Sequence, residues 1–414
     1  MAERLISVRC CIAGGGPAGM MLGVLLARAG VDVMVLEKHA DFLRDFRGDT
    51  IHPSTLELMH ELGWLEEFLR RPHQEATSLS AQIGNTSLQV ADFTHLPTRC
   101  KFIAFMPQWD FLDFLAEHAS GYPSFRLERR AEVTDLIEDG GRVIGLRANT
   151  AEGALEVRAD LVVGADGRHS TVRRKAGLQV DDLGAPMDVL WMRLSRRQND
   201  PQQTLGRADS GRILVMIQRG EYWQCGFVIP KGGFEAIRER GLASLRAEIA
   251  RLAPHFQDRV DELGEWNDIQ LLSVAVDRLR RWYRPGLLCI GDAAHAMSPI
   301  GGVGINLAVQ DAVAAANILA GRLLQGAPSL ADLGAVQRRR TFPTRMTQRL
   351  QVFLQKRIIG RVLADSGPLS LPWPLRLLRR SPHLQRLPAR VIGMGFRPEH
   401  VGTGAAGGTG GSKR

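Results

Sequence analysis

The segment that decides the fold is residues 5–19, LISVRCCIAGGGPAG, in which an apolar run ends at Ala13 and meets a glycine-rich turn. A helical pattern follows from Pro17 to Ala29, and a second short apolar run covers Val31–Leu36. Apolar runs on either side of a helix indicate two buried strands of a βαβ unit. The G-x-G-x-x-G spacing at 14–19 therefore has the context that a dinucleotide-binding turn requires.

Each glycine of this turn has its own role in such a motif. Gly14 permits the tight turn, Gly16 lets the backbone approach a pyrophosphate, and Gly19 allows the helix and strand to pack closely. Glu37 ends the second strand about 20 residues further on, where its carboxylate can accept both hydroxyls of an adenosine ribose. A free 2′-hydroxyl favours FAD or NAD over NADP. A glycine-rich turn without a ligand is the alternative that this motif alone leaves open.

The composition is that of an ordinary globular protein. The chain has 414 residues, of which 44% are hydrophobic and 23% charged, so a sizeable core can form. No apolar run approaches the roughly 18 residues of a membrane-spanning helix, and no leader pattern is present, which predicts a cytoplasmic protein. The five cysteines lack zinc spacing and are expected to be buried, reduced thiols. We expect no metal site.

The chain is basic, with a net charge of +9, and its arginines are dense between Arg338 and Arg397. A solvated basic surface explains this balance, and contact with a polyanion is the alternative. No nucleic-acid-binding pattern accompanies the charge, so nucleic acid is not an expected partner.

Two further glycine-and-carboxylate turns follow apolar strands. The first is G-A-D-G at 164–167, which comes directly after Leu161–Val163. The second is G-D-A-A-H at 291–295, which comes after Leu287–Ile290 and continues through Pro299 and several glycines into a strong helix from Gly304 to Leu324.

In this order, the three turns resemble those of the para-hydroxybenzoate hydroxylase-like family of class A flavin-dependent monooxygenases, the FAD-binding aromatic hydroxylases. The motifs span residues 10–312, about three quarters of the chain. The resemblance implies an α/β fold in which a Rossmann-like FAD-binding domain carries an inserted, mostly antiparallel β-sheet substrate domain and a C-terminal helical region. We assign 1–75, 100–185 and 276–330 to the first, 76–99 and 186–275 to the second, 331–400 to the third, and 401–414 to a disordered tail.

The same resemblance implies a function. FAD would be bound non-covalently and reduced by NADH or NADPH, which docks only transiently. Reaction with O2 would give a flavin C4a-hydroperoxide that hydroxylates an organic substrate, expected to be aromatic or phenolic. Two alternatives remain: a flavoprotein of this fold that reduces or epoxidises isoprenoid-like substrates, and a non-catalytic FAD-binding or membrane-surface protein that uses its basic C-terminal helices. The protein is expected to be a monomer or a homodimer.

The family's contacts transfer to individual positions of this chain. By resemblance, Asp292 bonds the ribitol of FAD, and Gln108 contacts the diphosphate or ribitol. The family's aspartate at the position of Asp166 is linked to both flavin and nicotinamide handling, whereas here we expect Asp166 mainly to shape a turn near the pyrophosphate. Arg47 matches a cofactor-binding arginine, whereas Gly48-Asp49-Thr50 departs from the residues that usually follow it. The full set of expected FAD contacts is Gly14, Gly16, Pro17, Ala18, Gly19, Glu37, Lys38, Arg47, Gln108, Val133, Asp166, Gly291, Asp292, Pro299, Gly302, Gly304 and Asn306.

Catalytic and substrate-binding residues are less defined by the sequence. His52 is either a catalytic base, because a near-neutral imidazole suits phenol deprotonation, or a cap for the helix at Pro53. Asp49 is the other candidate for catalysis. Alternation in the strand-rich block from 186 to 275 makes Trp191, Met216, Tyr222 and Gln224 candidates for the substrate pocket, with ordinary core packing as the alternative.

Overall fold

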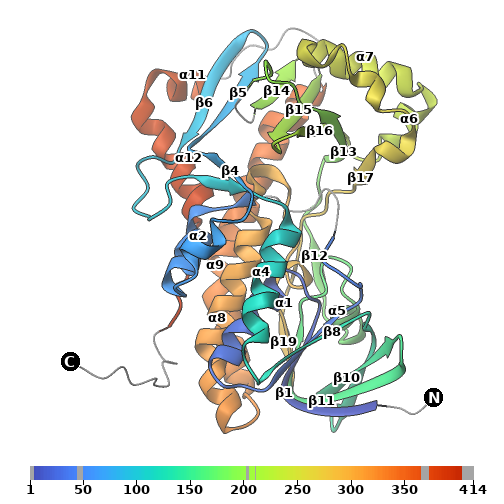
Figure 1. Cartoon of the computed structure of the whole chain (residues 1–414), viewed down its shortest axis with the longest axis vertical. Coiled ribbons are helices and arrows are strands. Elements are labelled where there is room, and N and C mark those ends of the chain that lie inside the picture. The colour runs from blue at the N-terminus through green and yellow to red at the C-terminus, as the bar shows by residue number, and fades with distance from the viewer. Residues whose placement is uncertain (1–3, 44–49, 202–204, 210, 365–372, 403–414) are drawn as a thin grey trace.

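A computed structural model of the chain describes residues 4–43, 50–201, 205–209, 211–364 and 373–402. Figure 1 shows an elongated molecule with one sheet and its long helices in the lower half and a second sheet in the upper half. The chain crosses between the halves several times, so each half is built from segments far apart in the sequence.

The first sheet has the strand order β19-β20-β11-β1-β2-β8, with β9 and β10 attached to β11. Its central strands β20, β11, β1, β2 and β8 are parallel, as expected for a Rossmann-like fold. The strands are β1 (Arg4–Ala13), β2 (Val33–Glu37), β8 (Phe125–Arg129), β9 (Glu132–Asp139), β10 (Arg142–Thr150), β11 (Gly153–Gly164), β19 (Tyr283–Arg284) and β20 (Leu287–Cys289).

The strands from 125 to 163 differ from the β-meander that their turn signals suggest. Only β9, β10 and β11 form antiparallel hairpins. β8 instead lies parallel to β2, and β11 continues parallel to β1. The turn residues encode the hairpins locally, whereas the two parallel pairings join strands that are distant in the sequence.

Four long helices cover the first sheet: α1 (Pro17–Arg28), α4 (Gln108–Ser120), α8 (Gly304–Gln325) and α9 (Leu330–Leu354). α1 packs against α4 and α8, and α8 packs against α9. The segment Ile300–Gln325 is long enough to cross a membrane and contains an 18-residue window with a mean hydropathy of 1.4, so our expectation that no such run exists was wrong. Of that window, 72% is buried inside the protein, because the neighbouring helices cover its small apolar residues.

The second sheet has the order β17-β13-β16-β15-β14-β5-β6 and is antiparallel except for the β14–β5 pair. It joins strands from both segments that we assigned to a substrate domain. Its strands are β5 (Ser78–Ile83), β6 (Thr86–Asp92), β13 (Met187–Ser195), β14 (Leu205–Asp209), β15 (Arg212–Gln218), β16 (Tyr222–Pro230) and β17 (Gln270–Leu272).

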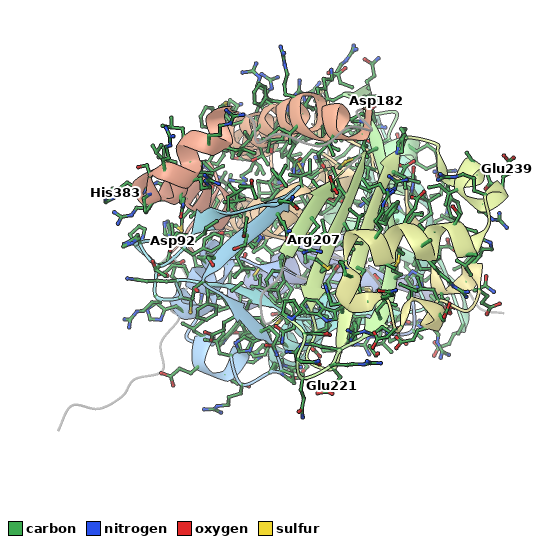
Figure 2. The ribbon with its side chains drawn as sticks, turned by 90° about the horizontal axis from the view of Figure 1, so that it is seen from above. Asp92, Asp182, Arg207, Glu221, Glu239 and His383 are labelled. Atoms are coloured by element: carbon green, nitrogen blue, oxygen red, sulfur yellow. The ribbon has the colours of Figure 1, made fainter. Side chains whose placement is uncertain are left out.

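Helices cover this sheet on two sides. In Figure 2, α6 (Phe234–Glu239) and α7 (Leu242–Leu252) lie across the strands from the C-terminal helices. The C-terminal helices continue from α9 through a π-helical turn, η6 (Gln355–Ile359), to α10 (Gly360–Ala364), α11 (Trp373–Arg380) and α12 (Pro382–Met394). α10 contacts β15 and β16, and α12 packs on β6 and α2 (Pro53–Glu61).

The smaller elements connect these layers. Val401 and Gly402, expected in a disordered tail, are held by hydrogen bonds to Glu61 and Asn317, and residues 403–414 lie outside the described part of the chain. All five cysteines are buried and form no disulfide, which confirms the expectation of core thiols. The remaining helices and strands are β3 (Thr50–Ile51), α3 (Leu65–Phe68), β4 (Gln74–Ala76), β7 (Ile103–Phe105), α5 (Thr171–Lys175), β12 (Val180–Asp182) and β18 (Asp277–Leu279).

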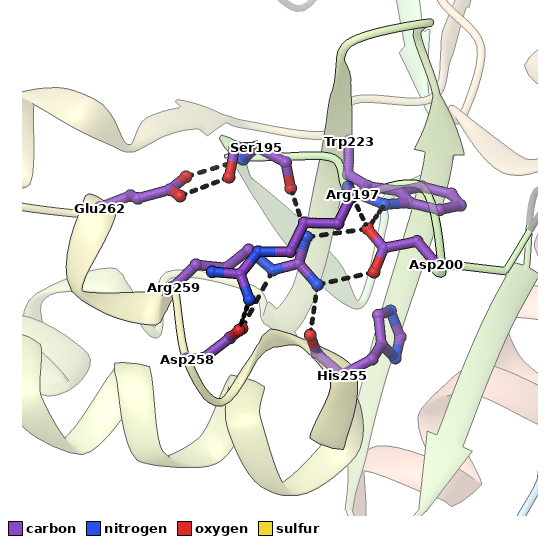
Figure 3. Close-up of polar contacts among 8 residues, drawn as sticks. All are labelled: Ser195, Arg197, Asp200, Trp223, His255, Asp258, Arg259 and Glu262. Atoms are coloured by element: carbon purple, nitrogen blue, oxygen red, sulfur yellow. Dashed lines mark hydrogen bonds and ion pairs between the residues drawn. The ribbon is translucent and has the colours of Figure 1, made fainter.

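A buried ion pair ties the end of β13 to the segment after α7 (Figure 3). Arg259 donates two hydrogen bonds to Asp200, of 2.8 and 2.7 Å, and both side chains are only 3% exposed. Trp223 Nε1 donates a further bond of 2.9 Å to the same carboxylate. Burial opposes ionisation of Asp200, but these hydrogen bonds outweigh it and hold the pKa of the carboxyl well below its usual range.

Replacing Asp200 with alanine is expected to lower the free energy of unfolding by roughly 3–5 kcal/mol, because the buried Arg259 guanidinium then keeps only the half-exposed Asp258 as a counter-charge. Asp258→Ala is the matched control: Asp258 pairs with Arg197 and lies 3.3 Å from Arg259 Nε, but it is 49% exposed, so about 1 kcal/mol or less is expected. Urea denaturation followed by circular dichroism measures both. Equal losses would show that burial of the Asp200 pair has no special weight.

Candidate functional site

The first glycine-rich turn lies between β1 and α1, as the sequence predicts. Gly14 has a φ of 104°, and a Cβ there would lie 2.4 Å from the carbonyl oxygen of Ala165. A Cβ on Gly19 would lie 1.9 Å from the carbonyl oxygen of Gly14. Both positions therefore require glycine for internal packing. A Cβ on Gly16, in contrast, would meet nothing within 4 Å, so its backbone faces open space at the N-terminus of α1.

Glu37 ends β2 beside this turn. Its carboxylate accepts hydrogen bonds from the backbone N–H of Gly15, at 2.9 Å, and of His39, at 3.0 Å. The backbone N–H of Ala131 bonds to the Glu37 carbonyl, which brings the start of β9, with Val133, next to the end of β2. Lys38 follows Glu37 and is exposed.

The G-A-D-G turn lies against the first turn. Asp166 accepts hydrogen bonds from the Ser170 hydroxyl and, at 3.1 Å, from the backbone N–H of Val172. Burial raises the pKa of this carboxyl, while the hydrogen bonds act in the opposite direction. Asp166 thus holds together the turn before α5.

The G-D-A-A-H turn begins at the end of β20. A Cβ on Gly291 would lie 3.0 Å from the Cβ of Ala18 in α1 and 3.4 Å from that of Ala308 in α8. The third turn therefore packs closely on the helix that the first turn opens. The Asp292 side chain is 33% exposed, and its carboxylate lies 3.6 Å from Arg168 of the second turn.

The three turns share one edge of the first sheet at one level. Ala13 pairs with Gly164 across β1 and β11, and Gly164 pairs with Cys289 across β11 and β20. All three strands are parallel, so the turns that follow them leave the sheet side by side. This carboxyl edge is where open α/β sheets bind their ligands.

The segment before α8 turns sharply through two glycines. Gly301 and Gly302 have φ angles of 77° and 63°, and the Thr50 hydroxyl donates a 2.7 Å hydrogen bond to the Gly302 carbonyl. The Asn306 side-chain oxygen accepts bonds from the His52 backbone N–H, at 3.1 Å, and from the Thr55 hydroxyl, at 2.6 Å. Asn306 thereby fixes the start of α8 against the start of α2. Pro299 lies in the same turn, and Gly304 opens α8 with free space around it.

His52 precedes α2 and is fully buried. Its Nδ1 lies 2.7 Å from the Ile392 carbonyl of α12, and the side chain makes no capping bond to α2. His52 is therefore at the helix N-terminus, but its imidazole does not cap it. Burial lowers the pKa of His52 to about 4, which keeps the ring neutral at pH 7. Its Nε2 has no hydrogen-bond partner within the described residues.

Gln108 is the first residue of α4. Arg47 and Asp49 lie outside the described residues.

A buried set of charges that the sequence analysis missed supports the third turn. Asp311 accepts bonds from the Gly291 N–H, at 3.1 Å, and from Arg340, at 2.8 Å, and lies 2.6 Å from His295 Nε2. His295 and Asp311 both belong to the third motif, so the sequence could have indicated their contact. No local sequence pattern indicates that Arg340 joins them.

The pocket candidates divide between the two faces of the second sheet. Trp191, Tyr222 and Gln224 point to the face opposite α7. Residues paired across two strands share a face, and these three pair across β13 and β16 with Gly226, Ser195 and Arg193. Met216 was placed wrongly: it is 1% exposed in the core between the sheet and α7. In β15 the face opposite α7 carries Val215 and Ile217 instead, one register position away.

The residues at the carboxyl edge fit FAD. The backbone of Gly16 faces open space at a helix N-terminus that attracts a pyrophosphate. Glu37 ends the second strand where a ribose is expected, and the Asp292 carboxylate is partly exposed beside Gly291. The donors are amides and carboxylates, as a dinucleotide requires.

A parallel sheet with three such turns at its carboxyl edge, combined with a second antiparallel sheet, defines a Rossmann-type flavoprotein. The sequence profile described as the FAD binding domain matches residues 7–350. The chain belongs to the FAD-dependent aromatic hydroxylase family, and it is a monooxygenase-type flavin oxidoreductase.

Two named relatives support this assignment. The chain is 37% identical over 362 residues to 6-methylpretetramide 4-monooxygenase of Streptomyces rimosus, covering 86% of each chain. It is 31% identical over 313 residues to 12-dehydrotetracycline 5-monooxygenase/anhydrotetracycline 6-monooxygenase of Streptomyces rimosus subsp. rimosus, covering 73% of this chain and 60% of that one. It therefore spans only about three fifths of the second relative's length.

A solved structure shows the same fold. The crystal structure of pqsL, a probable FAD-dependent monooxygenase from Pseudomonas aeruginosa, superposes with a TM-score of 0.73 over 86% of this chain and 98% of that chain, at 22% identity.

Proposed function

We propose that this protein is an FAD-dependent monooxygenase that uses NADH or NADPH and O2 to hydroxylate a polycyclic phenol of the polyketide type. The observation that carries the proposal is the alignment of the three turns at Ala13, Gly164 and Cys289 on one sheet edge. The substrate class is supported by the similarity to an enzyme named for its action on 6-methylpretetramide.

Bound FAD supplies hydride acceptance and oxygen activation, and the chain supplies position and electrostatics. The N-terminus of α1 would hold the pyrophosphate, Glu37 the ribose and Asp292 the ribitol. The N-terminus of α8, with Gly302 and Gly304, offers a partial positive charge to the anionic form of a reduced flavin.

The face of the second sheet opposite α7 suits an apolar aromatic substrate. Trp191, Val215 and Ile217 pack there with Phe93 and Phe105. This mainly apolar surface would exclude water from the reaction, which limits wasteful loss of activated oxygen.

The test begins with the purified protein, which should carry a yellow flavin. Anhydrotetracycline is expected to stimulate oxidation of NADH or NADPH, and isotopically labelled dioxygen is expected to place one labelled oxygen atom in the product, measured by mass spectrometry. Isoprenoid substrates form the second arm. Reduction or epoxidation in that arm alone would replace the proposal by the isoprenoid alternative, and no stimulated turnover in either arm would contradict it.

Membrane-surface contact through the basic C-terminal helices and the oligomeric state stay predictions. Leu377 in α11 and Leu387 in α12 are 50% and 63% exposed among arginines, which is the arrangement that such a contact would use.

A further inference from the structure

Three glutamines form a stripe along the inner side of α9 and the π-helical turn η6. Gln348, Gln351 and Gln355 follow one another at spacings of three and four, which place side chains on one side of a helix. All three are buried, with exposures of 0%, 3% and 0%. A row of buried amides must find hydrogen-bond partners or weaken the fold.

The first two glutamines bind the segment that leads to the Gly301-Gly302 turn. Gln348 Nε2 donates to the Ala296 carbonyl at 3.1 Å. Gln351 Nε2 donates to the carbonyls of Ser298, at 2.9 Å, and Ile300, at 3.0 Å, and its Oε1 accepts from the Ser298 N–H at 3.1 Å. Successive glutamines therefore bind successive parts of one segment, which runs along α9 toward the start of α8.

The third glutamine differs from the other two. Neither Nε2 nor Oε1 of Gln355 has a hydrogen-bond partner in the part of the chain that the structure describes. Gln355 is also the residue at which the α-helix widens to a π-turn, closed by the Gly360 N–H on the Gln355 carbonyl. π-turns inside helices occur frequently at functional sites. A buried amide with both atoms unsatisfied is costly, so its retention needs an explanation.

The residues of η6 and α10 pack against the segment that leads to the Gly301-Gly302 turn. Ile359 and Leu363 pack in one apolar cluster with Trp191 of β13 and with Ile300. All four of these residues are partly exposed. Trp191 Nε1 is itself buried with no partner among the described residues. Trp191 belongs to this cluster, and Gln355 lies one turn before Ile359 in η6. The two unsatisfied polar groups are therefore carried by the strand and the helical turn whose residues form the cluster.

We infer that Gln355 is a substrate-binding residue whose carboxamide pairs with a hydrogen-bond donor and acceptor that stand side by side, as in a hydroxyl next to a ketone on a polycyclic phenol. Trp191 Nε1–H supplies a second donor to the same molecule. The inference rests on the proposed function, because it takes the space beside Ile300 as the place of the substrate. It adds a polar specificity determinant to a pocket that is otherwise apolar.

The test compares Gln355→Leu with Gln351→Leu, which removes a glutamine of the same stripe whose amide is fully bonded. In the FAD-loaded protein without substrate, Gln355→Leu should melt at the wild-type temperature or higher, because it removes an unsatisfied group from the interior. Gln351→Leu should melt lower. Gln355→Met, of similar volume, serves as a second variant in case leucine packs poorly.

Binding is then measured with anhydrotetracycline, which carries a hydroxyl beside a ketone, and with naphthol, which carries a hydroxyl alone. Flavin absorbance changes report the dissociation constants. Gln355→Leu should weaken anhydrotetracycline binding by about tenfold or more, leave naphthol binding within about twofold, and leave FAD content unchanged.

A Gln355→Leu variant that melts as low as Gln351→Leu, and binds both probes like the wild type, would overturn the inference and make Gln355 a structural residue. If the wild type binds neither probe, the proposed function is at fault; a lowered melting temperature of both Gln355 variants would then still overturn the inference.

Discussion

Gly16→Ala is expected to leave the fold intact and to abolish most FAD binding. Gly16 has a φ of −75°, which alanine adopts freely, and an added Cβ would meet no protein atom within 4 Å. The open space that tolerates this methyl group is the space through which a pyrophosphate must approach the N-terminus of α1. We expect the dissociation constant for FAD to rise on the order of a hundredfold, because the methyl group holds the phosphates away from the helix amides.

The measurement is fluorescence quenching of added FAD by the apoprotein, together with the apoprotein melting temperature. Gly14→Ala is the matched comparison, since a Cβ there lies 2.4 Å from the Ala165 carbonyl oxygen and its φ of 104° is strained for alanine. This second variant should lose both stability and FAD. A Gly16→Ala protein that binds FAD as tightly as the wild type would disprove the role given to the first turn.

Asp292→Ala is expected to remove most FAD from the purified protein. Asp292 follows a glycine that packs directly on α1 and α8, so its position relative to the first turn is rigid. Loss of a charge-assisted hydrogen bond to the ribitol should weaken FAD binding by about ten- to a hundredfold. The flavin absorbance of the purified protein, relative to its protein absorbance, measures the bound fraction.

Arg168→Gln separates this role from the ion pair. Arg168 lies 3.6 Å from the Asp292 carboxylate, so both variants break the same contact, but only Asp292→Ala removes the carboxylate. Arg168→Gln should therefore keep its flavin. Equal loss of flavin in the two variants would show that Asp292 acts only through Arg168, and full retention in Asp292→Ala would contradict the assignment.

The motif-bearing parts of the fold follow from local sequence. Gly19 is required by its contact with the Gly14 carbonyl inside the turn, so the spacing of the two glycines identifies the βαβ unit, although Gly14 itself also packs on Ala165 of the distant second turn. Helices α1 and α8 begin at the expected residues, Pro17 and Gly304, because proline, glycine and apolar periodicity mark them locally.

The substrate side of the molecule was less predictable. Met216 and Val215 are neighbours in β15. The pairing of β15 with β16 decides which of the two side chains lies on the face opposite α7. A shift of one residue in that register would exchange the two faces, and the local alternation contains no information on it. Trp191 and Gln224 lie on the opposite face of the sheet from Met216, and this too is set by the pairing of β13, β15 and β16.

Amino-acid order alone thus determines the nucleotide-binding strands, their glycine turns and the family, because each depends on residues that are close together in the chain. Only the tertiary structure decides the parallel pairing of β8 with β2, the clustering of Asp311 with Arg340 and the unsatisfied state of the buried Gln355 amide. These features arise where segments separated by tens to hundreds of residues meet. Such contacts form only as the chain folds, so no short stretch of sequence specifies them.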